Sequence, residues 1–274
     1  MNRVKTILNY GLLALWALLC LYPLFWMIGA SVKEPMDVMG TYALFPSGTW
    51  HWETYVEVWK NLGFFKYFIN SVNVSFWTIL LINIFYALAG FAFAKLRFPG
   101  KNIVFFGFIG MMFVPVITVL VPLYLIEYYL GFLDTHLGLI FPMVNGAAPL
   151  AIFLFRNYFR TIPHSLFESA RIEGASILRI LGQVYMPLAL PAMATITILN
   201  FLGSWNSLVL PMVILSTRKL FTLPIAVTLL DTGVFRQWNV LMAGSLISVV
   251  PVIVGFTALQ KYYIRGLVAG AVKA

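Results

Sequence analysis

The sequence predicts an all-α polytopic membrane protein with six transmembrane helices, and three observations lead to this class. Of the 274 residues, 61% are hydrophobic and only 10% are charged, whereas a soluble domain carries about 25% charged residues. The mean hydropathy is +0.91. Uncharged runs longer than about 18 residues are candidates for membrane-spanning helices, and the chain contains six such runs, separated by short charged segments.

Each expected helix lies inside one uncharged run. A bilayer core takes about 20 helical residues at a rise of about 1.5 Å each, so each run is expected to hold one helix. The first run resembles a signal peptide because Arg3 and Lys5 precede it, but it extends from Thr6 to Val32, which is too long for one. The expected spans of this single domain are residues 7–31, 68–94, 102–126, 135–155, 190–215 and 238–260.

The fifth run needs a separate argument because it has 38 residues, from Ile180 to Thr217. Pro187, Pro191 and Pro211 interrupt it, and proline breaks or bends helices. We expect one membrane helix over 190–215, preceded by an interfacial segment. Two helices joined by a tight turn are the alternative, and they would change the topology.

The distribution of basic residues predicts that both termini are cytoplasmic. Lys and Arg are enriched in cytoplasmic segments of membrane proteins. With the N-terminus inside, twelve of the 18 basic residues fall on the cytoplasmic side, and the other six fall outside. The cytoplasmic twelve are Arg3, Lys5, Lys95, Arg97, Lys101, Arg156, Arg160, Arg171, Arg179, Lys261, Arg265 and Lys273.

Three segments outside the spans are long enough to have a function of their own. The outer segment 33–66 contains Trp50, Trp52, Tyr55 and Trp59, which form either an interfacial aromatic belt or a surface that docks a partner. The outer segment 216–238 contains LFTLPIAVTLLD, which is too short to span and is expected to lie at the interface or to dip back into the protein. The third segment is the cytoplasmic loop 156–183.

Several classes of function lack their characteristic residues in this sequence. The basic residues form no continuous stripe for nucleic acid, and no span carries an ionisable group at its centre, as proton and ion carriers usually do. His51, His136 and His164 are isolated, Cys20 lies in an apolar run, and no phosphate loop or HExxH motif is present. We therefore expect no catalytic residues and no metal, and an energy source on another chain.

Uncharged polar side chains inside the spans are the candidates for a substrate path. Amides and aromatic rings suit a neutral, hydroxyl-rich solute such as a sugar, while the alternative is that they hold helices together. Pro142 and Pro149 flank Asn145, and prolines inside a span free backbone carbonyls. The candidates are Asn145, Asn200, Ser204, Trp205 and Asn206.

Local patterns in the cytoplasmic loop predict a short helix. Ser165 and Glu168 have the spacing of a capping box and follow Pro163, so the helix should start near Leu166. The alternative is that this helix is only a capped surface helix, without any other role.

A glycine elbow is expected to follow that helix. Gly174 suits the left-handed conformation that ends helices, and Ser176 can cap a second helix leading towards Pro187. The loop is thus a short helix that lies on the cytoplasmic face and is joined to a span by a turn.

The runs ESARIEGA, residues 168–175, and VYMPL, residues 184–188, resemble the EAA loop of ABC importer permeases. Ser169, Glu173, Val184 and Met186 depart from the usual Ala, Asp, Ile and Leu of that loop. RFPGK at 97–101, the long run 121–142 and GSWN at 203–206 resemble the carbohydrate branch, the permeases similar to the second maltose-importer subunit. The similarity covers nearly the whole chain.

This resemblance implies a type I importer permease fold, a cytoplasmic coupling helix and no enzymatic activity in this chain. The implied partners are a second related permease, two ABC ATPase subunits that bind ATP and Mg, an extracytoplasmic solute-binding protein, a sugar or oligosaccharide, and the lipid of a bacterial or archaeal plasma membrane. No nucleic acid is expected. A stand-alone secondary sugar carrier or channel is the alternative, and a membrane-embedded enzyme is a third hypothesis. The implied ATPase-coupling residues are Glu168, Ser169, Ala170, Arg171, Glu173, Gly174 and Ala175.

Overall fold

The computed structural model describes residues 3–40, 43–231 and 237–271, and every secondary-structure element in these ranges is a helix. The all-α class is therefore confirmed. The chain forms two compact units: unit 1 is Met1–Phe68 with Ile225–Pro251, and unit 2 is Ile69–Pro224 with Val252–Ala274. Residues 232–236 of the expected outer segment 216–238 lie outside the described residues.

Among the described residues, four helices are long and apolar enough to cross a membrane, and the number rises to six if two bent pairs each count as one span. The four single helices are α1 (Arg3–Ser31), α4 (Phe64–Lys95), α7 (Leu137–Thr161) and α14 (Trp238–Ala271). Prolines 23, 142, 149 and 251 lie inside three of these helices without ending them, as is common in membrane helices.

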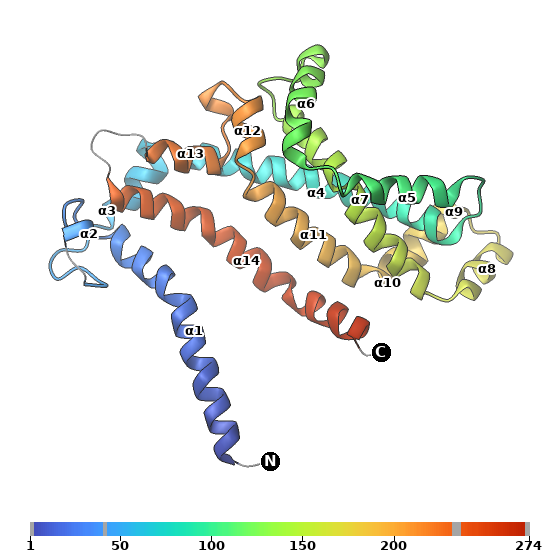
Figure 1. Cartoon of the computed structure of the whole chain (residues 1–274), viewed down its shortest axis with the longest axis horizontal. Helices are drawn as coiled ribbons and strands as arrows, with labels where there is room; N and C mark the ends of the chain where they lie inside the picture. Colours follow the sequence, from blue (N-terminus) through green and yellow to red (C-terminus); the bar gives the residue numbers. More distant parts are fainter. Residues whose placement is uncertain (1–2, 41–42, 232–236, 272–274) are drawn as a thin grey trace. The chain divides into compact units, whose positions relative to one another are not determined.

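The expected continuous helix over 102–126 is wrong. The chain forms α5 (Lys101–Met111) and α6 (Val116–Leu130), which meet at an angle of 102° (Figure 1). Pro115 is the N-cap of α6 in an extended conformation. Proline has no N–H to donate and disfavours a helical residue before it, which accounts for a break at this point.

The expected single helix over 190–215 is also wrong. It consists of α11 (Leu190–Trp205) and the six-residue α12 (Val209–Ile214). Pro211 cannot donate a helical hydrogen bond to Ser207, and its ring crowds that carbonyl, which favours the break before α12. Helix α12 is too short to span a membrane by itself, and the alternative of two membrane helices joined by a tight turn stays a prediction.

The segment before α11 is helical and bent. It runs through α9 (Ile177–Ile180), a π-helical turn η2 (Leu181–Tyr185) and α10 (Met186–Leu188). Together these meet α11 at 79°. The expected interfacial segment is therefore a helix of mixed type that turns sharply at Ala189.

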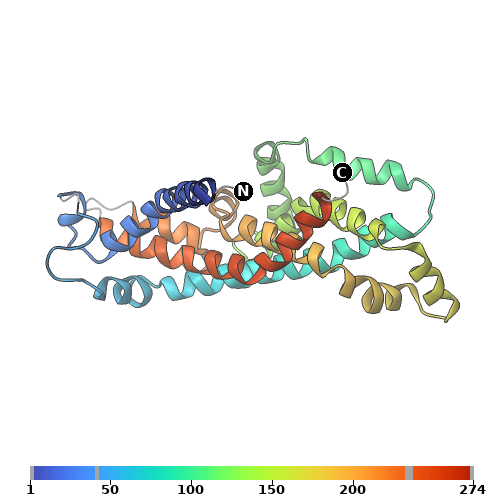
Figure 2. The ribbon, with the colours of Figure 1, turned by 90° about the horizontal axis from the view of Figure 1, so that it is seen from below.

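Helix α7 is central in unit 2, where it packs against α5, α11 and α12. Polar side chains join the neighbouring helices: the Tyr86 hydroxyl donates to the Val144 carbonyl at 2.8 Å, and Asn83 donates to the Thr197 hydroxyl at 3.1 Å. A Cβ added at Gly90 would lie 2.4 Å from Phe155 Cβ, so α4 and α7 approach closely there. In both views α4 and α7 lie close to each other (Figures 1 and 2).

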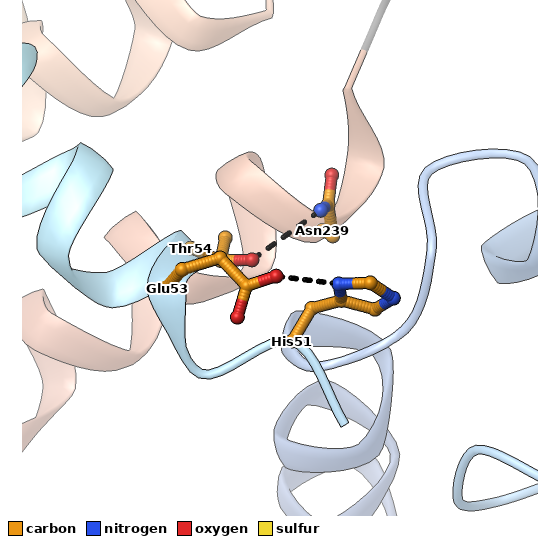
Figure 3. Close-up of polar contacts among 4 residues, drawn as sticks. All are labelled: His51, Glu53, Thr54 and Asn239. Atoms are coloured by element: carbon orange, nitrogen blue, oxygen red, sulfur yellow. Dashed lines mark hydrogen bonds and ion pairs between the residues drawn. The ribbon is translucent and has the colours of Figure 1, made fainter. Parts of the chain in front are cut away.

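Unit 1 contains α1, the short helices α2 (Asp37–Gly40) and α3 (Glu53–Val56), the π-helical turn η1 (Glu57–Asn61), and parts of α13 (Leu223–Leu230) and α14. None of the most apolar stretch of α1 is buried. Asn239 of α14 lies 3.5 Å from the Thr54 hydroxyl, next to a pair formed by His51 Nδ1 and Glu53 Oε1 at 2.6 Å (Figure 3). Its own backbone N–H and then His51 lower the pKa of Glu53 below its usual value.

The aromatic residues of the segment 33–66 form a ladder of stacked rings. Phe45 and Trp50 lie 5.9 Å apart, Trp50 and Trp52 5.8 Å, and Trp52 and Tyr55 6.2 Å between centroids. Trp50 and Trp52 stay about half exposed. The ladder is compatible with both expectations for this segment, a lipid-interface belt and a docking surface.

Candidate functional site

The EAA-like run forms helix α8 (His164–Ile172), which has no fully buried residue. Only Phe167 and Ala170, three positions apart on one face, are half-buried. Apolar side chains elsewhere on α8 face outward, and Ile172 is 87% exposed. A helix with so little of its surface used within its own chain has the form of an element that another molecule covers.

The expected capping box is wrong. Helix α8 begins at His164, its N-cap is Pro163, and no side chain caps it. Ser165 is therefore already inside the helix, because the extended Pro163 allows the helix to begin two residues earlier than expected. Glu168 lies one turn after His164, with Oε1 3.7 Å from Nε2, and its side chain is largely exposed.

The expected glycine stop is confirmed. Gly174 has φ +80°, in the left-handed region. Its N–H donates to the Arg171 carbonyl at 3.0 Å, and the Ala175 N–H donates to the Ala170 carbonyl at 3.0 Å. These two bonds form a Schellman motif. The expected cap of the second helix is also confirmed, since the Ser176 hydroxyl accepts from the Arg179 N–H at 3.3 Å.

A cluster of rings attaches α8 to the rest of unit 2, and we call Phe91, Phe159, Phe167 and Tyr185 the aromatic anchor. Phe91 of α4 lies 6.1 Å from Phe167 of α8, 5.0 Å from Tyr185 of η2 and 5.9 Å from Phe159 of α7, centroid to centroid. Phe91, Phe159 and Tyr185 are at most 2% exposed. The anchor therefore joins four helical elements at one buried point.

A buried lysine strengthens the same junction. Lys95, the last residue of α4, donates from Nζ to the Ile162 carbonyl at 2.6 Å, and this cation lies 5.4 Å from the centre of the Tyr185 ring. Ile162 is the residue between α7 and the N-cap of α8. The start of α8 is thus held to the end of α4 by a charge-assisted hydrogen bond and by the aromatic anchor.

The expected substrate-path residues lie in different environments. Asn145 on α7 and Asn206 after α11 are exposed, while Trp205 is 2% exposed and packs against Phe201. Asn200 donates to the Ile196 carbonyl of its own helix, and Ser204 donates to the Ser75 hydroxyl of α4 at 3.1 Å. Ser204 thus contributes to helix packing in unit 2, and a role of the five in a path stays a prediction.

Sequence reasoning missed the way in which residues 216–223 are fixed to unit 2. Asp134 Oδ1 accepts the N–H groups of Ser216 and Thr217, each at 2.9 Å, and Oδ2 accepts the Thr217 hydroxyl at 2.6 Å. These bonds lower the pKa of Asp134 to about 2. Further along, Asn70 donates to the Lys219 and Phe221 carbonyls, at 3.0 and 2.9 Å.

A cavity of about 450 Å³ lies beside this fixed segment, and sequence reasoning missed it as well. Asn73, Trp77 and Leu81, spaced by one helical turn on α4, line it together with residues 135–137, 140 and 141. His136 in its wall has Nδ1 3.4 Å from Asn73 Nδ2 and Nε2 3.0 Å from the Leu220 carbonyl oxygen. The spacing of Asn73 and Trp77 was the available clue.

Within the residues that the structure describes, no three His, Cys, Asp or Glu side chains come together in a way that could hold a metal ion. Glu127, just beyond the expected third span, lies inside α6 and is 3% exposed.

Residues 86–268 match the family described as binding-protein-dependent transport system inner membrane component. The chain is 31% identical to the arabinooligosaccharides transport system permease protein AraQ of Halalkalibacterium halodurans, covering 94% of this chain and 92% of that protein. It is 30% identical to the galactooligosaccharides transport system permease protein GanQ of Bacillus subtilis, covering 98% and 96%.

A solved structure with a similar fold is that of a bacterial ABC transporter involved in the import of the acidic polysaccharide alginate. One of its chains has a TM-score of 0.84 and 28% identity, and the match covers 95% of this chain and 97% of that one. With the family match over more than half of its length, this chain is a member of the family of inner membrane components of binding-protein-dependent transport systems.

Proposed function

We propose that this chain is the transmembrane permease subunit of an ATP-driven ABC importer that translocates a sugar or oligosaccharide delivered by a solute-binding protein. The observation that carries the proposal is α8, a helix exposed on most of its surface and held at its base by the aromatic anchor. The family match and the oligosaccharide permeases among the relatives support the substrate class.

The exposed surface of α8 is proposed to dock into an ABC ATPase subunit. Two such subunits, with ATP and Mg bound to them, a second related permease and an extracytoplasmic binding protein would complete the importer. The coupling residues on this chain would be Glu168, Ser169, Ala170, Arg171, Glu173, Gly174 and Ala175. Most of them are exposed, which supports a contact with another chain.

The aromatic anchor gives a physical route for the coupling. A displacement of α8 would press Phe167 against Phe91, and Phe91 contacts α7 and η2 through Phe159 and Tyr185. Close-packed buried rings resist compression, so the displacement would reach three helices together. ATP binding would favour the outward-open state through its contacts in the ATPase, without touching the sugar.

The remaining parts of the proposal concern the two faces of the membrane. We propose that both termini and α8 face the cytoplasm of a bacterial or archaeal cell, and that residues 216–238 face the binding protein. The sugar would pass near Asn145, Asn200, Ser204, Trp205 and Asn206. Exposure of Asn145 and Asn206 supports a role for these two most directly.

The test combines a pull-down with an energy requirement. The purified chain, in mild detergent, is expected to retain an ABC ATPase, and sugar uptake by cells is expected to stop when ATP is depleted while the ion gradient is kept. Glu168→Lys should abolish uptake, because it reverses an exposed charge, at unchanged membrane abundance. Glu57→Lys, another exposed acid on a helix outside the loop, is the matched control. Uptake that continues without ATP and without a retained ATPase would refute the proposal.

A stand-alone secondary carrier is the alternative function, and one observation favours it. Glu127 is buried in α6, and its Oε2 has no hydrogen-bond partner among the described residues. Buried carboxyl groups of this kind mark proton paths in carriers. If this alternative holds, Glu127→Gln abolishes gradient-driven uptake in cells that lack ATP.

A further inference from the structure

Four basic side chains of unit 2 gather where three helices end. Arg97 follows the end of α4, Lys101 begins α5, and Arg156 and Arg160 lie in the last two turns of α7. The Arg156 guanidinium lies over the ring of Phe105, one helical turn after Lys101 on α5, so the basic end of α7 packs against the start of α5. The start of α5 lies at the same end of unit 2 as α8 and α9 in both views (Figures 1 and 2).

No carboxylate of the described chain balances this charge. The ion pairs His51–Glu53 and His164–Glu168 of the described residues do not involve the four cations. The Arg156 guanidinium lies 3.8 Å above the Phe105 ring, and its Nε is buried without a hydrogen-bond partner among the described residues. Gathering like charges costs free energy, so this arrangement is suited to an anion that comes from outside the chain.

A hollow lies beside two of these cations, Arg97 and Lys101. A pocket of about 440 Å³ is lined by Arg97, Phe98, Gly100, Lys101, Asn102 and Ile103. The pocket contains the N-terminus of the eleven-residue α5, which no side chain caps, and helix N-termini favour negative charge. The positive charges and the free end of α5 therefore point to a phosphate-sized anion.

The rim of the pocket identifies which kind of phosphate fits. Ile103 is 80% exposed and Phe106 is 65% exposed on α5, which is half of a bent pair able to span the membrane. Apolar side chains next to a cationic pocket, at the ends of membrane helices, match a molecule with an anionic head and acyl chains. Basic pockets between membrane helices bind anionic headgroups in this way.

We propose that the turn Arg97–Lys101, the start of α5 and the Arg156–Arg160 end of α7 form a binding site for the phosphate headgroup of an anionic phospholipid. The headgroup would lie in the pocket beside Lys101, with Arg156 and Arg160 next to it, and its acyl chains would lie along Ile103 and Phe106. The site is separate from the exposed surface of α8, and it does not depend on which solute is transported.

The test measures lipid retention by the purified full-length chain in a neutral detergent, using native mass spectrometry. The chain is titrated with phosphatidylglycerol, with phosphatidylcholine of the same acyl chains, and with inorganic phosphate. Phosphatidylglycerol should bind in preference to phosphatidylcholine, and millimolar phosphate should displace little of it. Arg156→Gln with Arg160→Gln should weaken phosphatidylglycerol binding about 30-fold, which converts to about 2 kcal/mol, or roughly 1 kcal/mol per charge.

The controls keep the proposal open to refutation. Arg218→Gln with Lys219→Gln removes the same charge from another exposed loop and should leave binding unchanged, and Arg156→Lys with Arg160→Lys should retain most of it. If the glutamine pair fails to fold, Arg97→Gln with Lys101→Gln tests the same site at the turn. Equal phosphatidylglycerol binding by wild type and the glutamine variants overturns the proposal. So does full displacement by phosphate, which indicates a free-anion site, or unchanged lipid binding with loss of a copurifying ATPase, which indicates a protein-docking surface.

Discussion

Asp134 holds a whole loop through one carboxylate. It has φ +56°, a conformation that a non-glycine residue adopts at a cost of about 1–2 kcal/mol. Its three accepted hydrogen bonds, together with a bond from its own N–H to the Ile214 carbonyl at 2.9 Å, offset that cost. Asparagine tolerates the same backbone conformation, so a substitution can isolate the role of the charge.

We expect the stability of the chain to depend on Asp134 at low pH. The pKa of Asp134 is about 2 in the folded chain, against 3.8 for an ordinary aspartate. The ionised carboxylate therefore stabilises the fold above about pH 4, and this contribution is lost as the pH falls from 3.8 through 2. In Asp134→Asn, thermal unfolding in detergent should lack this part of the acid dependence, and at pH 7 the fold should lose about 1 kcal/mol.

Thr217→Val is the companion variant for this measurement. It removes only the bond from the Thr217 hydroxyl and leaves the two backbone donors, so it should keep part of the acid dependence. An identical pH profile for Asp134→Asn and wild type would show that the carboxylate does not hold the loop.

Substitutions at Gly174 distinguish backbone strain within this chain from steric obstruction by a partner. Nothing lies within 4 Å of a Cβ added there, so the only cost inside this chain is the positive φ, about 1 kcal/mol for alanine and less for asparagine. Gly174→Asn and Gly174→Ala should therefore remain folded, while Gly174→Leu should lose uptake in cells despite normal membrane abundance. Wild-type uptake by the leucine variant would exclude a tight contact with the ATPase at this turn.

At the scale of the helical elements, the two predicted caps in the cytoplasmic loop had different outcomes. Ser176 caps α9, because its backbone is extended and its hydroxyl faces the Arg179 N–H. Ser165 has the sequence pattern of a cap but lies inside α8. Ser176→Ala should lower the free energy of unfolding by about 1 kcal/mol, and Ser165→Ala should change it by less than about 0.5 kcal/mol. Chemical or thermal unfolding of both variants in one detergent decides this, and equal losses would contradict the assigned start of α8.

The elements that could be predicted from the sequence are those with a local cause. The uncharged runs gave α1, α4, α7 and α14, and glycine at position 174 gave the left-handed turn. The break before Pro115 could not be predicted from proline alone, since Pro122 lies inside α6 without ending it. Which proline interrupts a helix depends on whether neighbouring groups satisfy the freed carbonyl, and that is a property of the packed helices.

The candidate functional site also combines features that the sequence predicts with features that only the fold reveals. The residues of the coupling loop follow from a contiguous motif, and the structure adds the aromatic anchor behind them. Phe91, Phe159 and Tyr185 come from three elements far apart in the sequence, so only the fold brings them together. The charges of Arg97, Lys101, Arg156 and Arg160 are evident in the sequence, but the pocket lined by Arg97 and Lys101 and the packing of Arg156 over Phe105 of α5 appear only in the fold.

At the scale of the whole molecule, the orientation in the membrane can be tested with two exposed serines. Cys20 is the one cysteine of the sequence, so Cys20→Ser gives a cysteine-free background. In intact cells, a membrane-impermeant maleimide should label Ser216→Cys, expected outside, and should label Ser169→Cys, expected in the cytoplasm, only after permeabilisation. The opposite pattern would invert the topology predicted from the basic residues.

The π-helical turn η2 has a consequence for how length changes in the chain are tolerated. Five residues, Leu181–Tyr185, form a wider turn than an α-helix would, so this turn holds one residue more than the α-helical spacing requires. Deleting one residue here can convert the turn to α-helix, and the side chains of α11 would then keep nearly the same orientation. Helix α8 contains no such extra residue. A deletion within it therefore rotates the helical residues that follow by about 100°. Natural or engineered single-residue deletions in this loop should therefore be tolerated at η2 and excluded from α8.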